Sequence, residues 1–150
     1  MNKSEQINEL AKALSQAQSE MRGAVKDAQN PFFKSRYSDL ESCWDAAREP
    51  LTKNGLSVSQ TMGFKAECGP TLITTLLHTS GQWIEGEQPV FPKSQAPQDM
   101  GSAITYSRRY GFAAIVGLYQ TDDDAETAHG RPSQPQNKPT HAGNRPPQRF

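Results

Sequence analysis

The sequence has few of the groups that support covalent or metal chemistry. Its 150 residues include two cysteines, Cys43 and Cys68, and they do not lie in a CxxC or zinc-type spacing. The three histidines also lack metal-ligand spacing. Neither the GxxxxGK(S/T) phosphate loop nor the GxSxG nucleophile elbow is present. The sequence therefore predicts no structural disulfide, no resident cofactor, no ATP hydrolysis and no serine-type acyl transfer.

Long apolar runs are absent too. The longest covers residues 112–116, whereas a membrane-spanning helix needs about 20 apolar residues. The first residues alternate charged and small side chains, which is unlike the apolar centre of a signal peptide. We therefore expect a cytoplasmic protein with no membrane partner.

Acidic residues are absent from the end of the chain. All 16 lie within residues 1–126, while residues 129–150 contain five prolines, three glutamines and four of the 16 basic residues. Residues 1–128 thus carry a net charge of −4 and the tail carries +4. Such a tail buries too little apolar surface to become ordered, so we expect one domain at 1–128 and a disordered basic tail at 129–150. The tail is either a mobile cationic arm or a solubilising segment.

Apolar periodicity predicts a first helix near the start of the chain. Apolar residues recur at spacings of three and four over residues 7–28, and the pattern ends at Asn30-Pro31. The stripe is either a core face or a contact with a neighbouring subunit, because its spacing also suits a helical seam.

A capping-box pattern predicts a second helix. Ser38 is followed three residues later by Glu41, ahead of an apolar stripe that includes Cys43. Pro50 should kink or restart this helix, and Gly55 stands where a C-terminal cap is expected. Cys43 is then a small core residue rather than a nucleophile.

Three strands are predicted after the second helix. Residues 56–62 alternate as a half-buried strand does, and residues 71–79 are rich in β-branched side chains, as a central strand is. A tight turn at residues 80–81 leads into residues 82–87, which completes an antiparallel meander. Residues 88–98 contain three prolines and form a long loop.

The pattern becomes helical again from Asp99. One side of this helix should face the sheet, with small residues that permit close approach: Met100, Ile104, Ser107, Gly111 and Ala114. The order of helix, helix, three strands and helix predicts an α+β fold.

Two arginines and two tyrosines lie together on this last helix. Arginine suits phosphate oxygens, and tyrosine offers a flat surface for an unpaired base. Tyr106, Arg109 and Tyr110 share a face, so we expect Arg109 to face DNA, with Arg108 either joining it or pairing with an acidic neighbour. The alternative is an ordinary solvated face or an ion pair.

A second basic and aromatic cluster surrounds Asn30-Pro31-Phe32-Phe33. The phenylalanines would anchor this loop in the core while the polar side chains form a basic rim. The candidate DNA-binding residues here are Lys26, Lys34, Arg36 and Tyr37, and Lys93 on the proline-rich loop is a weaker third candidate.

Three consecutive aspartates, Asp122, Asp123 and Asp124, are weak candidates for a metal site. A two-metal site normally gathers its carboxylates from separate elements, and adjacent residues point in different directions. The aspartates more plainly suit a helix N-terminus or basic residues of a neighbouring subunit.

The string GSAITYSRRYGFAAIVGL from Gly101, with the following DDDA, closely resembles the signature of the ERF (essential recombination function) family. The block NPFFKSRY from Asn30 resembles that family's other hallmark, and the two blocks stand in the family's order. The resemblance implies the β-β-β-α core of single-strand annealing proteins, single-stranded DNA as the partner, and homo-oligomeric rings or filaments. It also places the protein in a bacterial or phage-infected cell, where a host single-strand-binding protein or a phage exonuclease is a candidate partner.

The resemblance implies a protein that is not an enzyme and that anneals DNA strands without ATP during phage-type homologous recombination. Two alternatives stay open at this point. One is a metal-dependent nuclease that uses Asp122–Asp124, and the other is a passive single-stranded DNA-coating protein.

Overall fold

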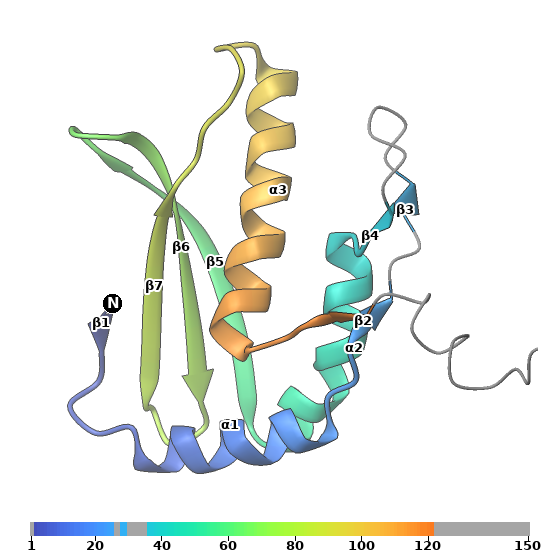
Figure 1. Cartoon of the computed structure of the whole chain (residues 1–150). Helices are drawn as coiled ribbons and strands as arrows, with labels where there is room; N and C mark the ends of the chain where they lie inside the picture. The colour runs from blue at the N-terminus through green and yellow to red at the C-terminus, as the bar shows by residue number, and fades with distance from the viewer. Residues whose placement is uncertain (1, 26–27, 30–35, 122–150) are drawn as a thin grey trace, which may run out of the picture.

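The computed structural model describes residues 2–25, 28–29 and 36–121, and the predicted tail at 129–150 lies outside them. Figure 1 shows how the elements are arranged. In chain order they are β1 (Asn2–Lys3), α1 (Asn8–Glu20), β2 (Ala24–Val25), β3 (Ala28–Gln29), β4 (Arg36–Tyr37), α2 (Leu40–Lys53), β5 (Leu56–Lys65), β6 (Gly69–His78), β7 (Trp83–Pro89), α3 (Pro97–Val116) and β8 (Gln120–Thr121).

An antiparallel meander forms the centre of the fold. β5, β6 and β7 pair in chain order with β6 in the middle, and Gly81 takes a positive φ of 85° in the turn before β7. The predicted α+β class, the three strands and the central place of β6 are confirmed. β1 adds a fourth strand beside β7, which the sequence does not predict because two residues carry no periodic pattern.

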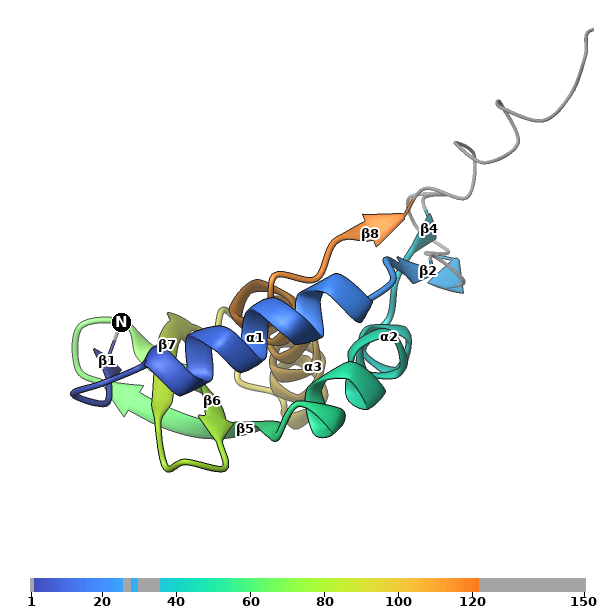
Figure 2. The same ribbon diagram turned by 90° about the horizontal axis from the view of Figure 1, so that it is seen from below.

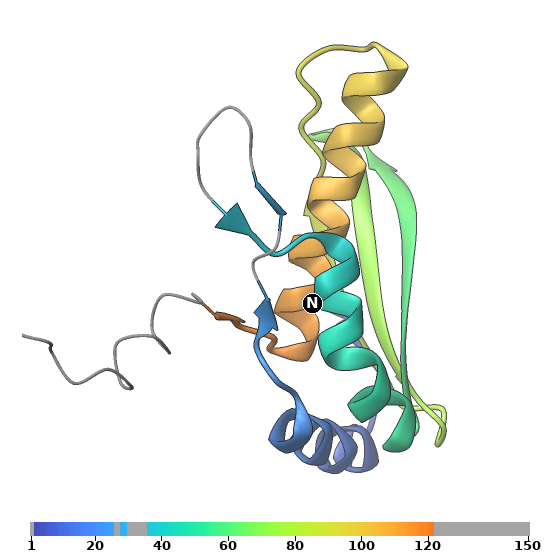
Figure 3. The same cartoon turned by 90° about the vertical axis from the view of Figure 1, so that its right-hand side faces the viewer.

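Side chains alternate between the two faces of this sheet. One face carries cross-strand neighbours such as Leu76 and Ile84, and α2 and α3 lie over it (Figure 3). The other face carries the row of Thr75 and Glu85, and no described element covers it. The apolar core of the described residues therefore lies between the sheet and its helices.

The first helix is shorter than its apolar pattern predicts. α1 ends at Glu20 rather than near Ala28, because the chain turns extended at Met21, where ψ is 136°. Ala24 is nevertheless fully buried, and β2 pairs in parallel with β8. The apolar pattern therefore predicts the burial of Ala24 correctly, but Ala24 belongs to strand β2 and not to helix α1. Seen from below, α1 crosses the end of α3 (Figure 2).

The second helix begins one residue later than its capping-box pattern predicts. Asp39 is the N-cap and accepts a 2.8 Å hydrogen bond from the Ser42 backbone N–H. Ser38 is buried and its hydroxyl donates to the Ala24 carbonyl at 3.0 Å. Pro50 lies inside a helix that continues to Lys53. Cys43 is fully buried, and this burial raises the pKa of its thiol, which confirms it as a core residue.

The third helix approaches the sheet most closely at Gly111. A Cβ atom on Gly111 would lie 2.6 Å from Thr74 Oγ1, so the helix backbone rests directly on β6. The helix starts at Pro97, two residues before the predicted Asp99, because proline is favoured in a first turn. Ala114 lines a hollow between α3 and β7 and remains exposed, so the sheet does not cover it.

Two glutamines of the sheet hold the middle of α3. Gln60 of β5 donates to the Arg108 carbonyl at 2.9 Å, and Gln88 of β7 donates to the Ser107 carbonyl at 2.7 Å. Because these carbonyls also belong to the helix, the two bonds fix its rotation about its own axis.

Replacement of Gly111 by alanine should destabilise the protein by about 1–3 kcal/mol, since the new methyl group overlaps the Thr74 hydroxyl. Gly101→Ala is the matched control on the same helix. A Cβ there meets nothing within 4 Å, so this change should stabilise the protein by about 0.5–1 kcal/mol. Urea unfolding of both variants measures the difference, and equal effects would contradict the close approach of α3 to β6.

Candidate nucleic-acid interface

Tyr106, Arg109 and Tyr110 of α3 form one compact cluster. The guanidinium carbon of Arg109 lies 4.5 Å from the centroid of the Tyr106 ring and 4.8 Å from that of the Tyr110 ring. The two ring centroids are 5.1 Å apart, and the Tyr110 hydroxyl donates to the Tyr106 hydroxyl at 3.4 Å. Cation–π attraction and ring packing therefore hold the three side chains together. We call them the Tyr-Arg-Tyr cluster.

Arg109, which we expected to face DNA, lies inside the domain. Its exposed fraction is only 4 %, and its Nη1 donates a 3.0 Å hydrogen bond to the Ser38 carbonyl. The reason is its place on α3, which turns it toward the start of α2 beneath the two tyrosines. The outer surface of the cluster is aromatic, since Tyr106 is 56 % and Tyr110 48 % exposed.

Arg108 does not join the cluster. Two residues along a helix correspond to a rotation of about 200°, so Arg108 and Tyr106 lie on opposite sides of α3. Arg108 is exposed, and its Nε donates to the Gln60 side chain at 3.3 Å. We expected Arg108 either to join Arg109 at the DNA or to pair with an acidic residue. Its hydrogen-bond partner is instead the side-chain amide of Gln60.

The residue that directly follows the first sequence block contacts the second block at the Tyr-Arg-Tyr cluster. Ser38, which accepts the hydrogen bond from Arg109, directly follows β4, the end of the first block. These residues are 71 positions apart in the chain. β3 and β4 lie on the side of α3 that is turned away from the sheet (Figure 3). The sequence analysis did not predict Ser38 or Asp39 at this site. Serine and aspartate at these positions are typical of a helix N-cap, and that pattern carries no sign of a contact with α3.

Comparison with known families identifies the chain. It matches the ERF superfamily over residues 10–148. The chain belongs to the ERF superfamily. The resemblance of the two sequence blocks is thereby confirmed, and it assigns this ERF protein to phage-type recombination and annealing. A search of curated proteins found no match, and a search of solved structures found none.

Several predicted residues of this ERF protein cannot be placed at the cluster. Lys93 is exposed in the loop between β7 and α3. The backbone of Arg36 and Tyr37 forms β4, but their side chains, like all of Lys26 and Lys34, lie outside the described part of the chain.

The predicted aspartate cluster at residues 122–124 also lies outside the described part. Within residues 2–25, 28–29 and 36–121, no three His, Cys, Asp or Glu side chains are grouped to hold a metal ion. No helix in those ranges is both long and apolar enough to cross a membrane.

Hydrogen bonding shifts the pKa values of the groups around the cluster. Because the Tyr110 hydroxyl donates to that of Tyr106, the pKa of Tyr106 is lowered and that of Tyr110 is raised. The backbone and side-chain hydrogen bonds from Ser42 lower the pKa of Asp39 below its ordinary value of 3.8, and the charge of Arg109 adds to this. Asp39 is therefore an anion at neutral pH beside a buried cation.

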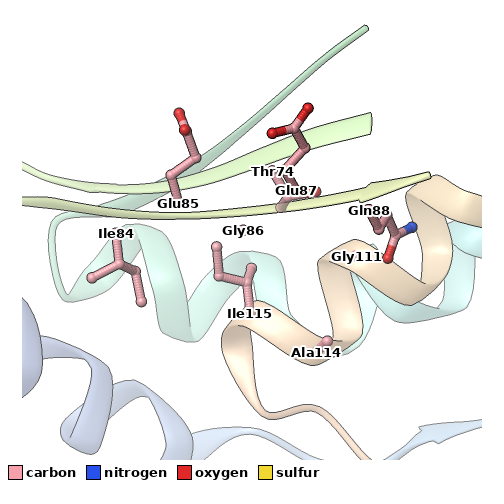
Figure 4. Close-up of a pocket in the computed structure, with 9 residues that line it drawn as sticks. All are labelled: Thr74, Ile84, Glu85, Gly86, Glu87, Gln88, Gly111, Ala114 and Ile115. Atoms are coloured by element: carbon pink, nitrogen blue, oxygen red, sulfur yellow. The ribbon is translucent and has the colours of Figure 1, made fainter. Parts of the chain in front are cut away.

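Two hollows flank α3. The α2–α3 pocket, of about 310 Å³, is lined by Asp39, Leu40, Gly101, Ser102, Thr105, Tyr106 and Arg109. The α3–β7 pocket, of about 200 Å³, lies on the other side of the helix. Figure 4 shows Ile84 and Ile115 beside this second hollow, while Glu85 and Glu87 point away from it. Of these two pockets among the described residues, the α2–α3 pocket is the one that adjoins the Tyr-Arg-Tyr cluster.

Asp39→Asn should reduce the acid sensitivity of folding. The folded-state pKa of Asp39 is lowered, so its contribution to stability is present above about pH 4 and is lost as the pH falls through the lowered pKa. Asparagine caps a helix about as well but does not titrate. Thermal unfolding between pH 7 and pH 2 should show a smaller loss of stability in the variant. Identical losses would contradict the ionised cap.

Proposed function

We propose that this ERF protein binds single-stranded DNA and anneals complementary strands without ATP during phage-type homologous recombination. The observation that carries the proposal is the hydrogen bond from Arg109 to Ser38. It joins the second ERF sequence block to the residue that directly follows the first, beneath a pair of exposed tyrosines. Membership of the ERF superfamily supports the same class of activity and a role without catalysis.

The exposed tyrosines suit unpaired bases. In a duplex the faces of the bases are stacked on each other, whereas a single strand can place a base on an aromatic ring. Such stacking contributes about 1–3 kcal/mol per base and does not depend on sequence. Tyr106 and Tyr110 have their ring positions fixed by Arg109, so little freedom is lost on binding.

Charge favours the same side of the molecule. The open face of the sheet carries Glu85 and Glu87. Lys65 offsets the charge of Glu87 through an ion pair, and the Glu85 carboxylate remains to repel phosphate. The block that ends at Tyr37, directly before Ser38, contains Lys34 and Arg36. We assign the phosphate contacts to this block, with Lys26 beside it, and the base contacts to the tyrosines.

One subunit offers few contacts to a strand, so the proposal includes a homo-oligomer, as a ring or a filament. Repetition of a weak site along one assembly raises the overall affinity without new contacts. Two strands held in this way would lose part of their mutual phosphate repulsion while their bases stay accessible for pairing.

The first test is renaturation of complementary strands without nucleotide. The protein should accelerate it equally with and without Mg²⁺ and leave the strands uncut. Binding without acceleration would instead indicate a passive coating protein. Cleavage that needs Mg²⁺ and is abolished in Asp122→Asn or Asp123→Asn would indicate the nuclease.

The second test separates base contacts from phosphate contacts. Tyr106→Ala with Tyr110→Ala should weaken single-strand binding by about 1–3 kcal/mol for each base that no longer stacks, while the salt dependence stays the same. The matched Tyr→Phe pair keeps the rings and should bind nearly as the natural protein does. Fluorescence anisotropy at several salt concentrations measures both quantities.

Lys34→Ala with Arg36→Ala should lower the salt dependence of binding, which the tyrosine variants leave unchanged. Removal of each bond to a phosphate should reduce the slope of log K against log salt by about 0.7, and the tyrosine contribution should persist. An unchanged slope would remove these two residues from the interface. Dissociation of the oligomer would assign them to assembly.

A further inference from the structure

We propose that the α2–α3 pocket receives one nucleobase of the bound strand. The inference rests on the proposed function and adds to it a specific place for a base beside the two tyrosines. The pocket opens next to Tyr106, which is both one of its walls and an exposed member of the Tyr-Arg-Tyr cluster. A base can therefore enter it directly from the aromatic surface.

The size and walls of the pocket suit a flat ring. Its volume of about 310 Å³ lies at the lower end of the range of about 300–1,000 Å³ for small-molecule sites. Tyr106 and Arg109 both line it. The Arg109 guanidinium already packs against the two tyrosine rings, so the exposed Tyr106 ring is the wall on which a base can stack. Gly101 also lines the pocket and has no side chain to occupy it. A Cβ there would meet nothing within 4 Å, so the pocket is open at this residue.

The polar groups of the pocket suit the edge of a base. Both hydrogen bonds from Ser42 are accepted by Asp39 Oδ1, and the Glu41 backbone also donates to this carboxylate. A carboxylate has about four acceptor sites, so Asp39 keeps the capacity to accept from an amino or imino N–H. The Thr105 hydroxyl donates to the Gly101 carbonyl at 3.0 Å, which leaves its oxygen as an acceptor. The Ser102 hydroxyl can donate or accept. A base edge presents both donors and acceptors, which matches this mixture.

A phosphate group would fit this pocket poorly. It carries only acceptors and negative charge, and the ionised Asp39 would repel it. Asp39 also offsets the charge of Arg109, so the pocket does not attract anions as a bare guanidinium would. The apolar side chain of Leu40 is a further wall that a base tolerates better than a phosphate does.

The test fills each pocket in turn and uses two kinds of strand. Gly101→Leu places a side chain in the α2–α3 pocket, and Ala114→Leu, on the same helix, fills the α3–β7 pocket as a control. Binding is measured with an ordinary oligonucleotide and with an abasic oligonucleotide of equal length, which keeps the phosphates and lacks bases. Ser102→Leu serves as a second filling variant should Gly101→Leu fail to fold.

Gly101→Leu should weaken binding of the ordinary strand about tenfold and leave the abasic strand within about twofold, and Ala114→Leu should change neither. A 2-aminopurine base in the strand should lose its fluorescence quenching in the filled variant. Equal weakening for both strands, or none for the ordinary strand, would overturn the base pocket. If Tyr106→Ala still weakens binding in that case, the proposed function stands. If the natural protein binds no strand, both proposals fail.

Discussion

The contact between Gly111 and Thr74 determines how the rest of the helical layer is arranged. Because the backbone of α3 rests on β6 there, each residue of the helix has a fixed direction. Phe112, one position on, turns toward α2 and packs against Trp44 with ring centroids 4.3 Å apart. Tyr106 and Tyr110 turn away from the sheet, and Arg109 lies between these two directions. The exposed tyrosines thus depend on a glycine on the far side of their own helix.

Arg109 has a structural role that its residue type does not suggest. A buried charge is costly unless polar groups surround it, and here the Ser38 carbonyl and the faces of two aromatic rings do so. The nearby Asp39 carboxylate adds a charge of opposite sign. One side chain therefore connects the start of α2 to the outer face of α3.

Much of the fold could be predicted from the sequence because its periodic patterns are long. The strands β5–β7 and helix α3 each repeat an apolar pattern over several residues, and tertiary packing agrees with it. Prediction failed where packing overrides local pattern. Ala24 continues the apolar stripe of α1, but its backbone pairs with a strand from the other end of the domain. Ser38 resembles a helix cap, yet its hydroxyl bonds to the Ala24 carbonyl.

The sequence predicts which residues of the Tyr-Arg-Tyr cluster lie together, but it does not predict how they are arranged. The grouping of Tyr106, Arg109 and Tyr110 follows from helical spacing alone. Which of them is exposed depends on where α2 begins, and no local pattern carries that information. The α2–α3 pocket likewise could not be foreseen, since its walls come from two helices that are far apart in the chain.

The parallel pairing of β2 with β8 has a consequence for the chain ends. Val25 is the partner of Thr121, so neighbouring backbones run about 4.8 Å apart at that point and in the same direction. The segment after Val25 leads into the first sequence block, and the segment after Thr121 leads into the four basic residues of the tail. The two strands therefore end side by side at Val25 and Thr121. Lys34 follows Val25 by nine residues and Arg131 follows Thr121 by ten, so the concentration that one basic group experiences of the other is limited by these chain lengths and not by the amount of protein in solution.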